Sequence, residues 1–436
     1  MKQISARLRS LVHLIPIWFT LFAAIFLAAN YGSSRYLHHL DYGRQIAKES
    51  QAAAESREEA RATFARYGLN YFERVYPGKS ESEIVQLIQD QAKTPVSYEP
   101  FVEFRSSPYI SPTLNIHSAG FRLIGPAQGP WPIDKNALNL FVFGGSMALG
   151  SAVADEDAIP AQLQHSLRAR TGLANLNVYN FAAGSHFSSQ EIAYLQNLLR
   201  AGIVPNIAVF IDGQNDFYFW NGETSESALF RWFVGSYGSP TPRQDFSIKT
   251  LPLFRLAREL RSHIGGPTAS AAASKSMETP STAQMTSDQL YESEYHDEAD
   301  ITDPGRIQQV IERYLTNKKI AEGVATAFHI EPYFVWQPSP LYKYDLRHHP
   351  KNFPDNHRRT RYGYPAMAAY VQDHDLGSDF DWCADIYEHA GKPLYTDIMH
   401  YNPEGNRLVA DCVASGLLRV GVIERARREQ VKSPGG

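Results

Sequence analysis

The chain has 436 residues, which is enough for one large α/β domain with appendages or for two domains, and its composition is that of an ordinary globular protein. Its formal net charge of −4 provides no excess of positive charge, so we expect no nucleic-acid partner. The sequence contains no zinc-type spacing of Cys and His, no Walker motif and no G-x-G-x-x-G motif. We therefore expect neither a metal nor an organic cofactor.

An almost uninterrupted apolar run extends from Leu11 to Asn30 without Asp, Glu, Lys or Arg. Its length suits one membrane-spanning helix, so we predict a cytoplasmic terminus at 1–10 and a transmembrane anchor at 11–31. Three basic residues precede the run: Lys2, Arg7 and Arg9. This flank favours export of the remaining chain. A cleaved signal peptide is the alternative, although the apolar core is long for one.

Two segments separate this run from the main domain. Residues 32–94 are rich in Ala, Glu, Arg and Gln and are typical of a helical linker, in which Ser80 and Glu83 form a capping-box pattern. We interpret this linker as a spacer that packs on the main domain. Residues 95–137 are rich in Pro, Ser, Tyr and Gly, which predicts an irregular extension with short hairpins.

The main domain is predicted at 138–425, and it begins with alternating strands and helices. A short apolar run from Leu138 ends in Gly144, Gly145 and Ser146, after which the pattern becomes helical. Further strands are predicted at 176–181, 206–211 and 333–336, with helices at 159–170, 189–199 and 306–330. Short connections between strand and helix indicate a parallel sheet with right-handed crossovers. The polar residues that follow the strands should therefore meet at one edge.

Two insertions interrupt this domain, at about 220–304 and at 342–379. The first contains a low-complexity stretch at 265–289, and the second is unpatterned and basic between residues 344 and 361. This basic segment is either a solvated loop or a lid that docks an anionic or sugar polymer. The chain then predicts a helix at 380–390, a short fifth strand at Leu394–Tyr395, a helix at 408–418 and a polar tail at 426–436.

The two cysteines, Cys383 and Cys412, are too few for a disulfide framework. They would pair in an oxidising compartment, but two buried free thiols are the favoured interpretation.

Several predicted strand ends carry groups that suit nucleophilic catalysis. Ser146 alone is typical of a helix cap, but a serine becomes a nucleophile when a histidine base lies in reach and an acid orients that base. His400 and Asp397 supply such a pair, three residues apart. Gly184 and Asn215 supply an N–H group and an amide that could stabilise a negative oxygen. His186, close to Gly184, is a weaker candidate.

At these positions the chain resembles the SGNH (GDSL-type) hydrolases. Four blocks occur in that family's order: F-G-G-S-M around Ser146, N-F-A-A-G at Gly184, G-Q-N-D at Asn215 and D-I-M-H from Asp397 to His400. The resemblance implies a three-layer α/β/α, flavodoxin-like fold with Ser146 as nucleophile, His400 as base and Asp397 as its orienting acid. It further implies an oxyanion hole made by Ser146, Gly184 and Asn215.

One residue departs from the family pattern, because Gly145 occupies the position where the name motif has Asp. This departure resembles membrane-anchored bacterial members, which also share the G-F-R segment at Gly120–Arg122. An α/β-hydrolase is the nearest competitor, but its G-x-S-x-G elbow is absent, since Ala148 stands at the last glycine position.

The resemblance implies a serine esterase that acts on ester groups, chiefly O-acetyl groups, of a cell-envelope polysaccharide or glycan. The expected location is the bacterial inner membrane, with one membrane-spanning helix, the catalytic domain in the periplasm and possible partners in a membrane complex. An O-acetyltransferase with the same triad is one alternative, since the acyl-serine intermediate is common to both. A non-catalytic polysaccharide-binding or assembly subunit that retains the fold is the other.

Overall fold

The computed structural model describes residues 21–22, 24–37, 68–92, 95–224, 227, 251–264, 301–350 and 358–432. The chain divides into two compact units. One comprises Met1–Glu55 and Arg231–Thr286, and the other comprises Ser56–Phe230 and Ser287–Gly436. All predicted catalytic residues belong to the second unit.

A five-stranded parallel sheet forms the centre of the second unit. Its strands are β5 (Leu138–Gly144), β6 (Leu176–Asn180), β7 (Ile207–Asp212), β8 (Glu331–Trp336) and β9 (Phe380–Trp382). They are arranged in the order β6-β5-β7-β8-β9. This is the flavodoxin-like order, in which the first strand lies between the second and the third. The prediction of a parallel, flavodoxin-like α/β sheet is confirmed.

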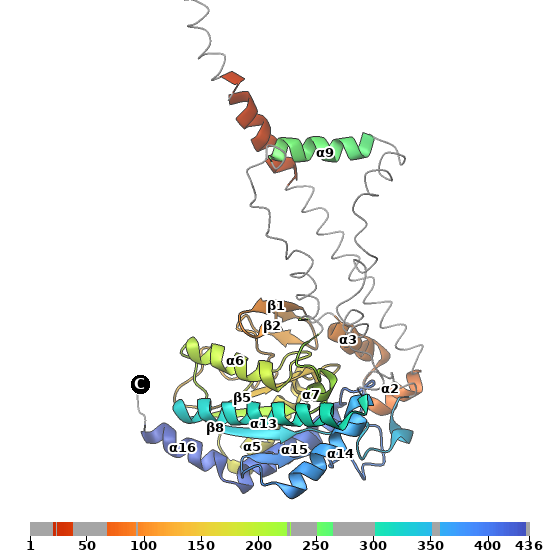
Figure 1. Cartoon of the computed structure of the whole chain (residues 1–436), viewed down its shortest axis with the longest axis vertical. Helices are drawn as coiled ribbons and strands as arrows, with labels where there is room; N and C mark the ends of the chain where they lie inside the picture. Colours follow the sequence, from red (N-terminus) through yellow and green to blue (C-terminus); the bar gives the residue numbers. More distant parts are fainter. Residues whose placement is uncertain are drawn as a thin grey trace, which may run out of the picture. The chain divides into compact units, whose positions relative to one another are not determined.

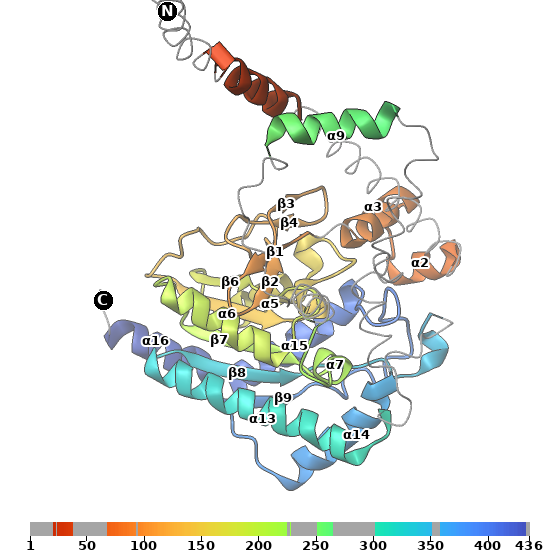
Figure 2. The same cartoon turned by 45° about the horizontal axis from the view of Figure 1, so that its top comes forward.

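Helices cover both faces of this sheet and make three layers. Side chains alternate along β5, so Leu140 and Val142 pack on the face that carries α5 (Ile159–Thr171) and α15 (Pro403–Arg419). Phe141 and Phe143 point to the opposite face, which carries α6 (Ser188–Arg200) and α13 (Pro304–Ala327). Figures 1 and 2 show α6 and α13 on one side of the strands, with α5 and α15 on the other. All seven residues of β5 are buried, and burial on both faces explains why the strand is apolar apart from Asn139.

Short helices follow the strand ends at one edge of the sheet. They are α4 (Ser146–Leu149) after β5, α7 (Gln214–Tyr218) after β7, and the 3₁₀ helix η1 (Asp155–Asp157) before α5. In a sheet of this order, ligands bind where neighbouring connections diverge, between the first and third strands. Ser146 and Asn215 stand at that switch point, at the ends of β5 and β7.

The segment before β5 packs against the same edge. Its elements are α2 (Leu69–Val75), α3 (Glu81–Ala92), β1 (Val96–Glu99), β2 (Glu103–Ser106), β3 (Tyr109–Ile110) and β4 (Asn115–Ile116). The capping box is present, because the Ser80 N–H donates to Glu83 and the Glu83 N–H donates to the Ser80 hydroxyl. The Tyr71 hydroxyl donates to the Tyr395 carbonyl at 2.6 Å, which ties α2 to the loop before His400.

Three element predictions in the last third of the chain were wrong. Residues 380–390 were expected to form a helix, but β9 occupies Phe380–Trp382 because its backbone completes the sheet beside β8. The expected fifth strand at Leu394–Tyr395 is only an isolated bridge between Tyr395 and Tyr401. The expected polar tail at 426–436 is largely helical, since α16 spans Val422–Lys432 and buries Val422, Ile423 and Ala426.

The basic insertion also contains an unexpected helix, α14 (Arg358–Asp373). Its charged residues concealed a helical repeat, because Thr360, Tyr364 and Met367 are buried at spacings of four and three. Tyr364 and Met367 pack with Trp336 in a cluster that α7 and α13 complete. The prediction of an unpatterned segment was therefore wrong for its second half, while residues 351–357 lie outside the described residues.

Cys383 and Cys412 form a disulfide, which corrects the expectation of free thiols. Cys383 directly follows β9 and Cys412 lies on α15, and their Cα atoms are 6.3 Å apart, within the range that a disulfide can bridge. Packing of α15 on the sheet brings the two residues together.

The first unit contains a helix at residues 21–22 and 24–37 and the helix α9 (Pro252–Ile264). The Leu253 N–H donates to the Asn30 side-chain oxygen at 3.2 Å, so this side chain joins the two helices. Among the described helices, none is both long enough and apolar enough to cross a membrane. Residues 11–20 of the predicted anchor and the low-complexity stretch at 265–289 lie outside the described residues.

Candidate active site

His400 lies within hydrogen-bond distance of both Ser146 and Asp397, so the ring connects the serine to the carboxylate. The Ser146 hydroxyl oxygen is 2.8 Å from His400 Nε2, although the two residues are 254 positions apart. His400 Nδ1 is 2.7 Å from Asp397 Oδ2. Gly145 is the N-cap of α4 and Ser146 is the first residue of the helix, so the interpretation of Ser146 as the helix cap is wrong.

A tight turn shapes the acid and the base. The Thr396 N–H donates to the His400 carbonyl at 2.7 Å, which closes the D-I-M-H segment. Asp397 Oδ1 accepts the backbone N–H groups of Met399 at 2.9 Å and His400 at 2.8 Å, as Asp side chains do in turns. With Oδ1 held by these donors, Oδ2 faces the imidazole. The spacing of three residues is what allows one carboxylate to bind both the turn and the ring.

The environment of Asp397 keeps its carboxylate ionised. Burial raises the pKa of this group, but the charge of His400 and hydrogen bonds from its ring and from the N–H groups of His400 and Met399 outweigh burial. The net effect holds the pKa of Asp397 well below its ordinary value. An ionised carboxylate only accepts hydrogen bonds, so His400 Nδ1 carries the proton and Nε2 can accept from Ser146.

Two backbone donors stand beside the serine. Among the described residues, neither the Ser146 N–H nor the Gly184 N–H has a protein acceptor. The Ala183 N–H donates to the Gly144 carbonyl at 3.0 Å, which places the turn after β6 against the turn after β5. A Cβ at Gly184 would meet no atom within 4 Å, so this residue borders open space.

The Asn215 amide is the third candidate donor. Its Nδ2 atom donates to the His186 carbonyl at 2.7 Å, which leaves one N–H of the amide without an acceptor in the described part of the chain. Gly145 makes room for this amide, because a Cβ on Gly145 would lie 2.2 Å from Asn215 Nδ2 and 2.9 Å from the His186 carbonyl oxygen. The position where the resemblance fails is thus a position of close packing against Asn215.

Asp216 and His186 fix the backbone that surrounds the Asn215 amide. Asp216 accepts from the Ser188 hydroxyl at 2.6 Å and from the Gly213 N–H at 3.3 Å, so it fixes the start of α7. His186 is only 1% exposed, its Nε2 donates to the Phe104 carbonyl, and burial lowers its pKa to about 4. The His186 side chain is therefore a buried structural group, and its carbonyl is what touches the site.

Gln91 is a residue of the site that sequence reasoning missed. Its Nε2 atom lies 3.2 Å from Asp397 Oδ2 and 3.2 Å from His400 Nδ1. Gln91 stands near the end of α3, in the segment interpreted as a spacer, and no motif marks it. Only the packing of α3 against the D-I-M-H turn reveals it.

In the described part of the basic segment at 344–361, several of the basic side chains are paired or buried and do not contribute to a free cationic surface. Arg347 pairs with Asp345 at 2.5 Å, and Arg359 is buried and donates to the Tyr218 carbonyl at 3.1 Å. His349 is buried against Tyr395, with ring centres 5.3 Å apart, and burial lowers its pKa to about 4.

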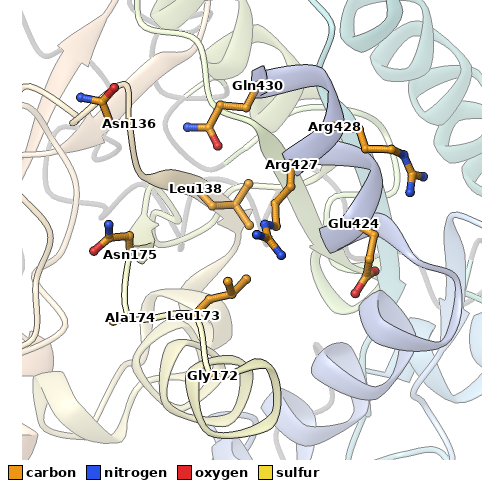
Figure 3. Close-up of a pocket in the computed structure, with 10 residues that line it drawn as sticks. All are labelled: Asn136, Leu138, Gly172, Leu173, Ala174, Asn175, Glu424, Arg427, Arg428 and Gln430. Atoms are coloured by element: carbon orange, nitrogen blue, oxygen red, sulfur yellow. The ribbon is translucent and has the colours of Figure 1, made fainter. Parts of the chain in front are cut away.

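A cavity of about 810 Å³ lies away from these residues, beside the amino ends of β5 and β6. Figure 3 shows Leu138 and Arg427 on its wall, with Leu173 and Asn175 across from the arginine. None of the candidate catalytic residues lines it. Within the described ranges, no group of three or more His, Cys, Asp or Glu side chains could hold a metal ion.

No family model matches the chain, and no curated protein matches it either. Several solved structures are similar to it. A member of the lipolytic protein G-D-S-L family from Veillonella parvula has 12% identity and a TM-score of 0.31, with 65% of this chain and 98% of that chain covered. A catalytic mutant of Axe2, an acetylxylan esterase from Geobacillus stearothermophilus, has 11% identity and a TM-score of 0.31, with 66% and 96% covered.

An alpha/beta hydrolase enzyme from the metagenome of Lake Arreo is also similar, with 13% identity and a TM-score of 0.29 over 66% of this chain and 98% of that one. With TM-scores below 0.5, these likenesses assign neither a family nor an activity to the chain. The functional conclusion rests on the geometry of the site.

Proposed function

We propose that this protein is a serine esterase of the SGNH type that works through an acyl-serine intermediate. The single observation that carries the proposal is the pair of distances from Ser146 to His400, 2.8 Å, and from His400 to Asp397, 2.7 Å. A serine hydroxyl, an imidazole and an oriented carboxylate in this geometry are the requirements for nucleophilic catalysis.

In this mechanism the Ser146 oxygen attacks the ester carbonyl carbon while His400 Nε2 takes the hydroxyl proton. Asp397 holds the ring in the required tautomer and stabilises the imidazolium. The Ser146 and Gly184 N–H groups and the Asn215 amide bind the oxygen that becomes negative. His400 then donates its proton to the leaving alcohol, and a water molecule activated by the same ring releases the acid and restores Ser146.

We propose that the acyl group is acetyl and that the substrate is an O-acetylated polysaccharide or glycan of the cell envelope. The resemblance of the four motifs to membrane-anchored SGNH proteins motivates this choice. Acetate release from O-acetylated polysaccharide, compared with p-nitrophenyl esters of increasing acyl length, tests it. Loss of activity with longer acyl groups and release of acetate from the polymer are expected, whereas a preference for long acyl chains would contradict the proposal.

We also propose a single-pass anchor in the bacterial inner membrane, with the catalytic unit in the periplasm. The apolar run from Leu11 to Asn30 supports an anchor, and apolar side chains remain exposed on its described part, including Phe22 (69%) and Ile25 (61%). The Cys383–Cys412 disulfide supports export, because disulfides persist in oxidising compartments. Membrane fractionation with alkaline extraction tests the anchor, and recovery of the intact chain in the soluble fraction would contradict it.

The esterase proposal is tested with p-nitrophenyl acetate and a fluorophosphonate probe. Wild-type protein should hydrolyse the ester and label with the probe, while Ser146→Ala should do neither. Equal turnover by Ser146→Ala and wild type would refute the mechanism. Absence of labelling together with measurable glycan binding would favour the non-catalytic alternative.

A further inference from the structure

The segment before the sheet contributes a side chain to the catalytic acid. Gln91 Nε2 lies 3.2 Å from both Asp397 Oδ2 and His400 Nδ1. Because Nδ1 already carries the proton that it donates to Asp397, it cannot accept a second one. The amide therefore donates to Asp397 Oδ2, the same oxygen that orients the imidazole.

Asp90, the neighbour of Gln91, fixes the end of α3. Its carboxylate is 2% exposed and accepts hydrogen bonds from three hydroxyl groups of the following segment. Tyr109 donates at 3.0 Å, Ser111 at 2.7 Å and Thr113 at 2.5 Å. A buried carboxylate with this many donors is a rigid attachment point, so the adjacent Gln91 has little freedom to leave the triad.

The same polar network continues to the helix of the nucleophile. The Ser111 N–H donates to Asn115 Oδ1, and the Asn115 amide donates to Asp155 at 2.7 Å. Asp155 in turn accepts from Arg122 Nε at 2.8 Å, and both of these side chains are buried.

Arg122 completes the connection, because its Nη1 donates to the carbonyls of Leu149 at 3.0 Å and Gly150 at 2.5 Å. Both carbonyls stand at the end of α4, the helix that Ser146 begins. One chain of hydrogen bonds thus runs from the helix of the nucleophile through Asp155 to Asp90, the residue next to Gln91. Both halves of the triad are attached to the segment before the sheet.

We propose that Gln91 is a positioning residue, which holds the Asp397–His400 pair in line with Ser146 from outside the sheet. This inference rests on the proposed function of the triad. It means that residues 68–92, which connect the N-terminal part to the sheet, are part of the catalytic apparatus. Activity then requires α3 to be docked against the D-I-M-H turn.

The test replaces Gln91 in the full chain by residues of similar size, so that the effect of losing its hydrogen bond is distinguished from the effect of losing side-chain volume. Gln91→Met keeps the length of the side chain and removes the amide, and Gln91→Glu replaces the amide by a carboxylate. Gln308→Met is the matched control, because Gln308 is exposed on α13 and, among the described residues, its amide donates only to Glu312. For each variant we would measure kcat and KM for p-nitrophenyl acetate against pH, the labelling rate by fluorophosphonate, and the low-field proton resonance of His400 Nδ1–H.

For Gln91→Met we expect kcat/KM to fall about tenfold, mainly through kcat, with slower labelling of Ser146 and a displaced or broadened Nδ1–H resonance. For Gln91→Glu we expect the acid limb of the pH profile to move to higher pH, since a second carboxylate favours the protonated ring. Gln308→Met should match the wild type. A Gln91→Met variant with wild-type kcat/KM, labelling rate and resonance would overturn the proposal.

Failure of the proposed function would look different. If Ser146→Ala were as active as the wild type, the serine mechanism would fall, and the Nδ1–H resonance of Gln91→Met would still decide the positioning role. If Gln91→Met did not fold, as judged by thermal unfolding, the pH profile of Gln91→Glu would decide it, and an unmoved acid limb would overturn the inference.

Discussion

Replacing Gly145 by alanine tests whether the Asn215 amide stabilises negative charge during the reaction. The backbone at Gly145 has φ −81° and ψ −160°, which an alanine adopts without strain, so the substitution acts only through its added carbon. That carbon would lie 2.2 Å from Asn215 Nδ2 and 2.9 Å from the His186 carbonyl oxygen. The amide must move, because the backbone carbonyl behind it cannot.

Loss of one oxyanion-hole donor costs about 10²–10³-fold in kcat, or about 3–4 kcal/mol of transition-state stabilisation. We expect Gly145→Ala to lose that much in kcat, with little change in KM, since the donor acts mainly in the transition state. Asn215→Ala should show a similar loss. The double variant should be no worse than either single variant, because both changes remove the same interaction.

The assay is steady-state hydrolysis of p-nitrophenyl acetate by four proteins: the wild type, Gly145→Ala, Asn215→Ala and the double variant. Gly323→Ala is the matched control, because Gly323 lies on α13 and a Cβ there would meet no atom within 4 Å. That control should keep the wild-type kcat. If Gly145→Ala kept the wild-type kcat, the role given to Asn215 would be refuted. The same would follow if the losses of transition-state stabilisation in the two single variants added in the double variant.

Three further changes have expected outcomes that the structure determines. In Asp397→Asn, the side-chain oxygen still accepts the Met399 and His400 N–H groups, so the NH₂ group faces His400 Nδ1. The amide then donates to Nδ1 and forces the wrong tautomer of the ring, and kcat/KM for ester hydrolysis should fall about 10⁴-fold. His186 binds a proton in the unfolded chain below pH 6.5 but in the folded chain only below about 4, so the unfolded state gains stability as the pH falls between these values. Between pH 7 and pH 4, the free energy of unfolding, measured with denaturant, should therefore fall by about 3 kcal/mol more in the wild type than in His186→Gln. An equal fall in the two proteins would contradict the burial argument. Replacing Cys383 and Cys412, which close a loop with a separation of 29 residues, by alanines should lower the free energy of unfolding by about 3 kcal/mol, and an unchanged value would show that the bond is not formed.

Residues whose role follows from local sequence could be predicted. The D-I-M-H turn is one example, because a carboxylate three residues before a histidine can bind both the turn and the ring of that histidine. The first strands could also be predicted, since β5 is apolar apart from Asn139 and short connections join the strands to the helices that follow them. From these patterns alone, the strand ends are expected to meet at one edge.

Residues whose role depends on distant packing could not be predicted in this way. Gln91 approaches Asp397 across 306 positions of sequence, and nothing near Gln91 encodes that contact. The spacing of Cys383 and Cys412 likewise says nothing about the docking of α15 on the sheet. The helix α14 was missed for a different reason, because its arginines concealed the buried repeat that includes Tyr364.

The central claim is that Ser146 carries the acyl group during turnover. Rapid acid quenching of the protein with p-nitrophenyl acetate, followed by peptide mass spectrometry, tests it most directly. We predict one added acetyl group on the peptide that contains Ser146, more of it in the early quench than after substrate is exhausted, and none in Ser146→Ala. Turnover with no acetyl group on Ser146, or with the acetyl group on another residue, would contradict the mechanism.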